Sequence, residues 1–320
     1  EDQLEQYVRQ SADNKLPRPT DDGIGKIEHN SNLAHFYAHF VRHTIDTSLE
    51  GMTIVYDGAN GAASSVGPEI LAGLGANVIN INVNPDGLNI NHHCGSTHIE
   101  GLQVAVQQHN ADLGIANDGD ADRCLLVDEK GQVLDGDQIM LLCALKLKEE
   151  GKLKGDTVVG TVMSNIGFHK AAEELGMKTV STAVGDRYVL EYMREHNLSI
   201  GGEQSGHVIF LDHNTTGDGM LTAVQVAALM KEKKQPLSEL AGIMTKYPQV
   251  LVNVRVATKT GWEDNDLIKA AIVTAEGELG DEGRVLVRAS GTEPLIRVMA
   301  EGPNQEELQS LCQEIADIIG

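Results

Sequence analysis

The chain is short of positive charge, with 25 lysines and arginines against 47 aspartates and glutamates. The formal net charge is −22 at pH 7, and the pI is near 4.8. A chain of this sign repels nucleic-acid backbones and anionic membrane surfaces, and no apolar run is long enough to span a bilayer. We therefore expect no nucleic-acid partner and no membrane partner.

Cysteine and proline are scarce as well. The four cysteines are scattered and include no Cys-x-x-Cys pair, which argues against disulfides and against a structural zinc site. With only 8 prolines, 34 glycines and 41% hydrophobic residues, the composition is typical of a soluble globular protein. A reducing compartment fits these cysteines best, so the sequence predicts a cytoplasmic location.

The 320 residues are enough for two or three domains. Residues 1–29 are polar and uneven and read as a linker, whereas residues 30–46 place apolar side chains at helical spacing. From residue 52 to residue 128, strand-like and helix-like segments alternate. This alternation predicts an α/β domain over residues 30–137.

A weak internal repeat follows. Residues 156–182 resemble residues 52–80, since each has a buried strand, a turn of small residues, a helix ending in Leu-Gly and a second strand. The repeat predicts a second, similar domain over residues 138–247. Residues 248–320 read as β-α-β-β-α. The expected fold is thus α/β, with two tandem similar domains of mixed sheets and flanking helices, followed by a small α+β domain.

Three aspartates alternate in the segment ANDGDADRCLLVD: Asp118, Asp120 and Asp122. An acidic turn between two strands is the simpler explanation, but three alternating carboxylates that project to one side suit a hard cation. A calcium-binding EF-hand fails, because Arg123 stands where the sharp turn needs glycine and strands flank the loop. We therefore predict a Mg²⁺ site, with Arg123 beside it and available to an anion.

Two later segments carry candidate substrate contacts. In GGEQSGHVIF, the residues Glu203, Ser205 and His207 alternate ahead of a strand and suit sugar hydroxyls, which both donate and accept hydrogen bonds. In VRASGTEPLIRV, a turn of small residues between arginines suits a phosphate group. The candidates in this turn are Arg288, Ser290, Gly291, Thr292 and Arg297. A glycine-rich turn and a hairpin turn are the respective alternatives.

Two other polar groups are assigned structural roles. The segment NHHCGSTH contains His92, His93, Cys94 and His98, but adjacent histidines point apart and no second ligand cluster supports a zinc site. Asp218 precedes a helical stretch and is expected to cap it.

The order of the three motifs resembles the α-D-phosphohexomutase family, from about residue 30 to the C-terminus. The segments SGTEPLIRVM and VGDRYVLE are most similar to its bacterial branch that acts on glucosamine phosphates. The resemblance implies the second, third and fourth of four domains, with residues 1–29 as a linker or a remnant of the first. It implies Mg²⁺ on the three aspartates, catalytic roles for Arg123 and His207, sugar contacts from the Glu203 segment and phosphate contacts from the Arg288 segment. A small phosphosugar is the implied substrate. A homodimer is one assembly that the resemblance allows for the intact enzyme.

The implied reaction is a phosphoryl exchange, in which a phosphoserine of the first domain phosphorylates one sugar oxygen and the other phosphate of the bisphosphate returns to the serine. Two departures from the family stand out. Ala121 replaces a glycine of the metal loop, which adds strain of roughly 1 kcal/mol if φ is positive there. No Ser-His-Asn-Pro segment, the kind that holds the phosphoserine, occurs in this chain. The alternatives are a glucose- or mannose-phosphate mutase of the same family, a non-catalytic phosphosugar- or metal-binding fragment and, weakest, a Mg²⁺-dependent phosphatase.

Overall fold

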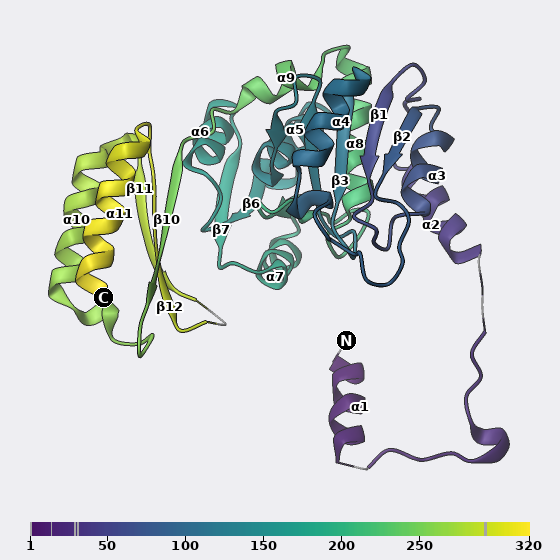
Figure 1. Cartoon of the computed structure of the whole chain (residues 1–320), viewed down its shortest axis with the longest axis horizontal. Helices are drawn as coiled ribbons and strands as arrows, with labels where there is room; N and C mark the ends of the chain where they lie inside the picture. The colour runs from purple at the N-terminus through teal and green to yellow at the C-terminus, as the bar shows by residue number, and fades with distance from the viewer. Residues whose placement is uncertain (1, 14, 29, 31, 291–292) are drawn as a thin grey trace. The chain divides into compact units, whose positions relative to one another are not determined.

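The computed structural model (Figure 1) describes residues 2–13, 15–28, 30, 32–290 and 293–320. The chain falls into two compact units, residues 1–36 and residues 37–320. Helix α1 (Asp2–Ala12) belongs to the first unit, and helix α2 (Asn32–Arg42) crosses the boundary. Within the described residues, no helix is both long and apolar enough to cross a bilayer.

The first α/β domain is built on a five-stranded sheet of order β2-β1-β3-β4-β5. Strands β1, β2 and β3 run parallel, and β4 and β5 continue the sheet antiparallel. The strands are β1 (Thr53–Asp57), β2 (Asn77–Ile81), β3 (Leu113–Asn117), β4 (Cys124–Asp128) and β5 (Val133–Leu134). Its helices are α3 (Val66–Gly73) and α4 (Glu100–His109).

The second domain repeats this arrangement in a four-stranded sheet of order β7-β6-β8-β9, with three parallel strands and an antiparallel β9. The strands are β6 (Thr157–Thr161), β7 (Lys178–Thr182), β8 (Ile200–Gly202) and β9 (Val208–Phe210). The helices are α5 (Gly136–Glu149), α6 (Ile166–Glu174), α7 (Asp186–His196), α8 (Gly219–Lys233) and the short α9 (Leu237–Leu240). The shared strand order confirms the prediction of two similar α/β domains with mixed sheets.

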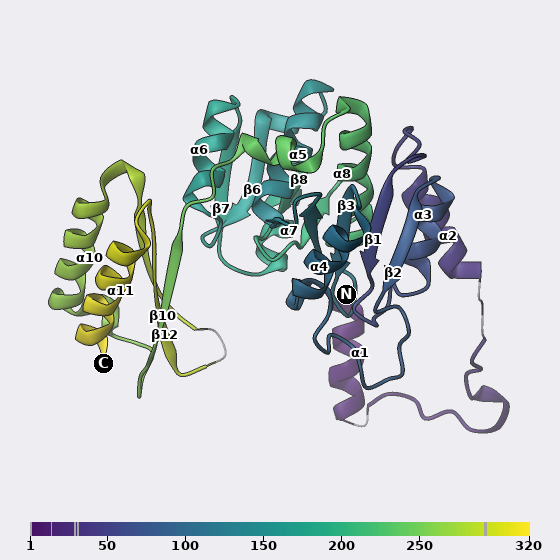
Figure 2. The ribbon, with the colours of Figure 1, turned by 45° about the horizontal axis from the view of Figure 1, so that its top comes forward.

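Helices α5 and α8 pack between the two sheets (Figure 2). Helix α8 packs on β3 and β4 of the first domain, and α5 packs on α8 and on β6 and β8 of the second. Both helices are apolar on most of their surface, and helices of that kind are stable only when buried. One continuous core therefore joins the two domains, running from Ile54 and Leu113 to Val158 and Phe168. Asp218 caps α8 by accepting a hydrogen bond from Leu221 N, as predicted.

The C-terminal domain has the order β-α-β-β-α, as predicted. Its antiparallel sheet has the order β10-β12-β11, and α10 and α11 lie side by side on one face (Figure 1). Val298 of the sheet and Leu308 of α11 belong to the core between these layers. The elements are β10 (Gln249–Arg255), α10 (Asp266–Leu279), β11 (Arg284–Ala289), β12 (Leu295–Glu301) and α11 (Gln305–Ile319).

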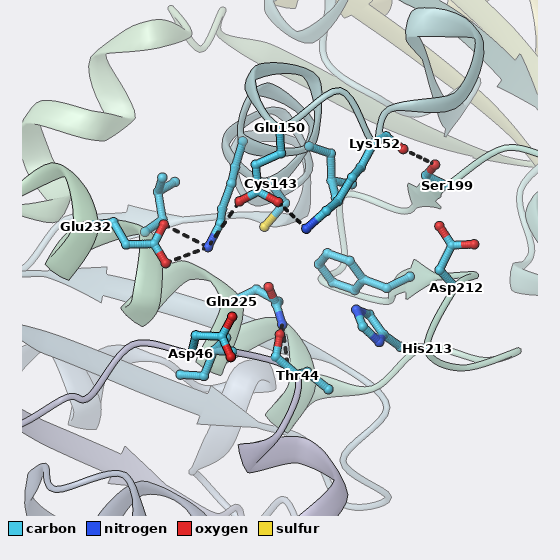
Figure 3. A pocket seen from close by; sticks show the side chains of 15 residues that line it. Thr44, Asp46, Cys143, Glu150, Lys152, Ser199, Asp212, His213, Gln225 and Glu232 are labelled. Carbon is cyan, nitrogen blue, oxygen red and sulfur yellow. Dashed lines mark hydrogen bonds and ion pairs between the residues drawn. The ribbon is translucent and has the colours of Figure 1, made fainter.

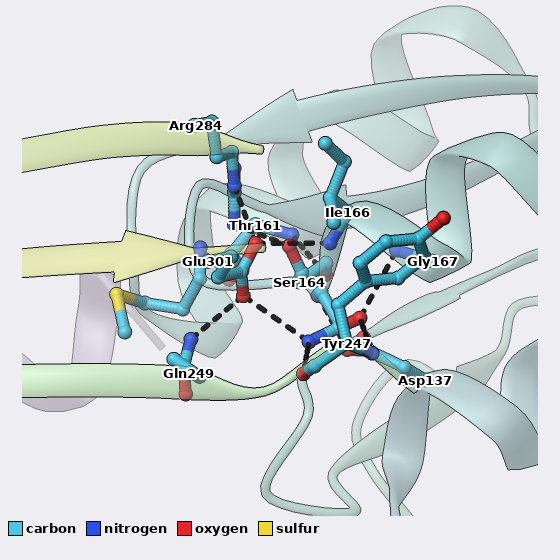
Figure 4. A network of polar contacts seen from close by, with 11 residues as sticks. Asp137, Thr161, Ser164, Ile166, Gly167, Tyr247, Gln249, Arg284 and Glu301 are labelled. Atoms are coloured by element: carbon cyan, nitrogen blue, oxygen red, sulfur yellow. Dashed lines mark hydrogen bonds and ion pairs between the residues drawn. The ribbon is translucent and has the colours of Figure 1, made fainter. Parts of the chain in front are cut away.

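A buried carboxylate links the C-terminal sheet to the second domain (Figure 4). Glu301 is fully buried at the end of β12 and accepts hydrogen bonds from Arg284 Nε at 2.6 Å and from Ile166 N at 2.9 Å. Gln249 Nε2 donates to the same carboxylate at 2.8 Å. Because a buried charge is tolerated only when it is paired and hydrogen-bonded, these contacts have to form together.

A pocket of about 290 Å³ lies where the segment after α2 meets α5 and α8 (Figure 3). Both lysines that line it form ion pairs with lining glutamates, Lys146 with Glu232 at 2.9 Å and Lys152 with Glu150 at 2.7 Å. No predicted site residue is among the described residues that line it. We interpret this pocket as a gap between packed elements that ion pairs hold together, and not as a ligand site.

Candidate functional site

The three aspartates lie in the loop between β3 and β4, and one carboxylate oxygen from each lies within 4.8 Å of the others. Asp118 is buried, and its burial, together with the neighbouring charge of Asp122, raises the pKa of its carboxyl group to about 6. Three carboxylates this close repel one another, and a cation removes that repulsion. Strands flank the loop, as expected for a site that is not an EF-hand.

Asn117, which the sequence analysis missed, closes the base of the aspartate loop. Its side chain is fully buried, and Nδ2 donates to Arg123 O across the loop at 2.7 Å. The hydroxyl of Tyr56 donates to Asn117 Oδ1 at 3.0 Å and orients the amide. In the sequence, the feature that could have identified Asn117 is its place at the end of an apolar strand, directly before the first aspartate.

Ala121 adopts the left-handed conformation, with φ at +63°. Its carbonyl accepts a hydrogen bond from Gly219 N at 2.9 Å, at the start of α8. An alanine in this region is strained, since its Cβ crowds the backbone. The strain predicted for this position is therefore present.

The segment containing Glu203, Ser205 and His207 connects β8 to β9. Glu203 Oε1 accepts a hydrogen bond from Gly185 N at 2.9 Å, just before α7. The segment also contacts the aspartate loop directly, because Cys124 N donates to Gly206 O at 3.0 Å. The structure thus brings together two motifs that are about 80 residues apart in the sequence.

The ring of His207 is only 3% exposed. Its Nδ1 lies 2.9 Å from Asp122 Oδ2, and its Nε2 lies 3.0 Å from Gly217 N. Both ring nitrogens therefore have protein partners.

The C-terminal motif lies at the turn between β11 and β12, where Arg288 stands directly opposite Arg297 in the strand register. Burial, and then the charge of Arg297, lower the pKa of Arg288. Ser290 is buried and accepts a hydrogen bond from Glu293 N at 3.3 Å through its hydroxyl. Arg297 pairs with the Glu293 carboxylate at 3.1 Å, and a further anion would offset the repulsion between the two opposed arginines. The predicted contacts Gly291 and Thr292 lie outside the described residues.

Half of the unsatisfied buried atoms fall on predicted site residues. In the part of the chain that the structure describes, eight buried side-chain atoms have no hydrogen-bond partner. Four of them are Asp122 Oδ1, Arg123 Nε, Ser205 Oγ and Arg297 Nε. Leaving such an atom unpaired costs about 1–3 kcal/mol, and most native buried groups are paired. Polar atoms of a ligand would supply these partners, so the pattern favours ligand sites over ordinary turns.

A pocket of about 390 Å³ opens at the aspartate loop. Asp120, Ala121 and Asp122 line one side, and Gly217 and Asp218 line another. Two of the three aspartates therefore border an open pocket.

Comparisons with known proteins fit this arrangement. Residues 34–131 match the description "Phosphoglucomutase/phosphomannomutase, alpha/beta/alpha domain II", residues 135–247 match domain III, and residues 251–318 match the C-terminal domain. The phosphoglucosamine mutase of Symbiobacterium thermophilum is 54% identical over 321 residues, covering 100% of this chain and 71% of the relative. The chain belongs to the phosphohexomutase family.

Other members of the phosphohexomutase family support the same placement. The phosphoglucosamine mutase of Bacillus subtilis is 49% identical over 100% of this chain and 71% of its own length. Among solved structures, a phosphoglucomutase/phosphomannomutase family protein from Burkholderia thailandensis has a TM-score of 0.78 at 22% identity, covering 99% of this chain and 70% of that one. N-acetylphosphoglucosamine mutase from Aspergillus fumigatus, in complex with GlcNAc-6P and magnesium, has a TM-score of 0.71 at 23% identity, covering 88% of this chain and 68% of that one. At these identities the two structures show a shared fold.

Proposed function

We propose that this chain is the metal- and substrate-binding part of a phosphoglucosamine mutase, which interconverts glucosamine 6-phosphate and glucosamine 1-phosphate. The observation that carries the proposal is the aspartate loop, in which Asp122 Oδ1 is buried, lacks a partner and lies beside Asp118 and Asp120. Relatives that are about half identical to this chain have the same activity in their names. The free cysteines, all buried, are consistent with a cytosolic location for this chemistry.

The oxygen-only donor set of Asp118, Asp120 and Asp122 fits Mg²⁺, and these residues would hold it. When bound, Mg²⁺ neutralises charge on a phosphoryl group during its transfer. Arg123 follows the third ligand, and its Nε lies 3.8 Å from Asp118 Oδ2 and 3.9 Å from Asp122 Oδ1, without a hydrogen bond to either. Its guanidinium is therefore available to bind and orient a phosphate oxygen.

The two remaining motifs would orient the sugar. Ser205 Oγ, buried without a partner, and the Glu203 carboxylate would bind sugar hydroxyls. The opposed Arg288 and Arg297 would hold the phosphate that is not being transferred, and their guanidinium groups match its oxygens in geometry. Ser290 and the predicted contacts Gly291 and Thr292 would complete this loop.

The phosphoryl donor of such a reaction is not provided by this chain, which contains no Ser-His-Asn-Pro segment. We therefore expect it to bind ligands but to show negligible turnover alone. The names of the matched family descriptions favour a second candidate, a phosphoglucomutase or phosphomannomutase. Titration with glucosamine 6-phosphate, glucose 6-phosphate and mannose 6-phosphate separates the candidates, because the true substrate class binds most tightly.

Calorimetric titration of Mg²⁺ into the parent chain and into Asp120→Asn tests the proposal. Asp120 is an exposed member of the triad, so the substitution removes a ligand charge while the fold remains intact. We expect weaker Mg²⁺ binding with an unchanged or slightly higher melting temperature, because like-charge repulsion is relieved. Equal Mg²⁺ affinity in both proteins would mean that the aspartate loop is an acidic turn and not a metal site.

A further inference from the structure

His207 contacts the aspartate loop from the other domain. It is the last residue of the β8–β9 segment, its ring contacts the loop that precedes α8, and it forms an antiparallel backbone bridge with Arg123. Its Nδ1 lies 2.9 Å from Asp122 Oδ2, while the other oxygen of Asp122 is the buried atom without a partner. The two oxygens of this carboxylate are therefore already different before any ligand binds.

The hydrogen bonds define the protonation pattern of the ring. The backbone N–H of Gly217 can only donate, so His207 Nε2, at 3.0 Å, accepts and carries no hydrogen. The hydrogen of the neutral ring is then on Nδ1, which donates to Asp122 Oδ2. A histidine held in one tautomer by a backbone group is a directional donor to a carboxylate.

The position of Gly217 requires the absence of a side chain. A Cβ built at Gly217 would lie 2.5 Å from Cε1 and 2.6 Å from Nδ1 and Nε2 of His207, well inside van der Waals contact. Any larger residue would displace the ring. The missing side chain at Gly217, two residues before α8, therefore allows the backbone to approach the face of this imidazole.

We propose that His207 is a positioning residue that turns Asp122 so that Oδ1 faces the cation and that couples the sugar-binding segment to the metal loop. The proposal rests on the proposed Mg²⁺ site and deepens it. Both ring nitrogens have protein partners, and through Nδ1 the ring contacts Asp122 directly. Because Glu203 and Ser205 are in the same short segment, a change in the metal loop is transmitted to the sugar contacts through His207 and through the Cys124–Gly206 hydrogen bond.

Two substitutions of the same histidine separate positioning from packing. In His207→Asn, the side-chain amide nitrogen takes the place of Nδ1 and still donates to Asp122. In His207→Gln, the amide takes the place of Nε2, so the donor to Asp122 is lost. Partners that orient metal ligands typically contribute 10–100-fold to metal affinity. We expect His207→Gln to weaken Mg²⁺ binding roughly 10-fold and His207→Asn to restore most of it. His213→Asn, at an exposed histidine of the loop between β9 and α8, is the control and should leave the affinity unchanged.

Gly217→Ala displaces the ring by a steric clash while leaving the imidazole and the Asp122 carboxylate chemically unchanged, and it should weaken Mg²⁺ binding to a similar degree. A long-range ¹H–¹⁵N spectrum of the parent chain, which needs no variant, should show His207 Nε2 without a proton and Nδ1 with one. A protonated Nε2 would overturn the proposal, as would Mg²⁺ affinities of His207→Gln and Gly217→Ala equal to that of the parent. If the parent itself binds no Mg²⁺, the proposed metal function fails, and the role of His207 fails with it.

Discussion

Asp137 is an aspartate whose ionisation opposes folding. It is fully buried near the start of α5, and its Oδ2 accepts a hydrogen bond from Asn165 N at 2.8 Å, close to the network of Figure 4. Its Oδ1 is buried without a partner. Burial, and then the nearby charge of Asp135, raise the pKa of Asp137 from 3.8 to about 7.

The raised pKa of Asp137 determines how the free energy of unfolding changes with pH. The unfolded chain loses the proton near pH 3.8, whereas the folded chain keeps it until about pH 7, so the folded state binds more protons between these values. Stability therefore falls as the pH rises from about 4 to 7. One pKa unit corresponds to about 1.4 kcal/mol, which gives a ceiling of about 2.7 kcal/mol between pH 5 and pH 7. We expect about 2 kcal/mol, because the structure relaxes around the new charge.

Asp137→Asn removes this titration and retains an oxygen for Asn165 N. The melting temperature of Asp137→Asn minus that of the parent should increase by roughly 3 °C between about pH 5 and about pH 8, for a cooperative unit of this size. Asp281→Asn, at an exposed aspartate of the C-terminal domain, is the control and should show no such trend. If the melting temperatures of the parent and Asp137→Asn change in parallel with pH, the account of this buried carboxyl is wrong.

Two further substitutions test the loops. Ala121→Gly should stabilise the chain by up to about 1 kcal/mol in thermal melts, since glycine accepts the positive φ without strain, and a lower melting temperature would contradict the assigned backbone. Arg288→Ala should cost about 1.5–3 kcal/mol of glucosamine 6-phosphate binding in calorimetry, with Arg288→Lys recovering only part and Mg²⁺ affinity unchanged. Equal sugar-phosphate affinity in the parent and Arg288→Ala would make that segment a hairpin turn only.

The order of the secondary structure was accessible from the sequence, because it depends on local patterns. Strands such as TIVYD and LGIAN are buried on both faces and read as apolar runs, and the repeat of residues 52–80 in residues 156–182 corresponds to the shared strand order of the two sheets. The packing of α8 on the first domain's sheet could not be predicted, since a helix that is apolar on most of its surface does not reveal which core it enters.

The contacts that hold the site together depend on residues far apart in the sequence. The alternation of aspartates marked the candidate metal loop, but nothing local shows that His207 meets Asp122 from 85 residues away. Glu301 likewise reads as the polar end of a strand, and only the fold buries it against Arg284 and the start of α6. Patterns of residue type predict candidate ligands, whereas the groups that orient those ligands appear only with the tertiary structure.

The central claim is that these three domains are a competent binding and metal-holding part of a phosphoglucosamine mutase. The most direct measurement fuses this chain to the portion of the Symbiobacterium thermophilum enzyme that it does not match and follows the conversion of glucosamine 6-phosphate in a coupled assay with Mg²⁺. The chimera should turn over glucosamine phosphates, while this chain alone and the Asp120→Asn chimera should not. A folded chimera without activity, beside an active Symbiobacterium enzyme, would contradict the claim.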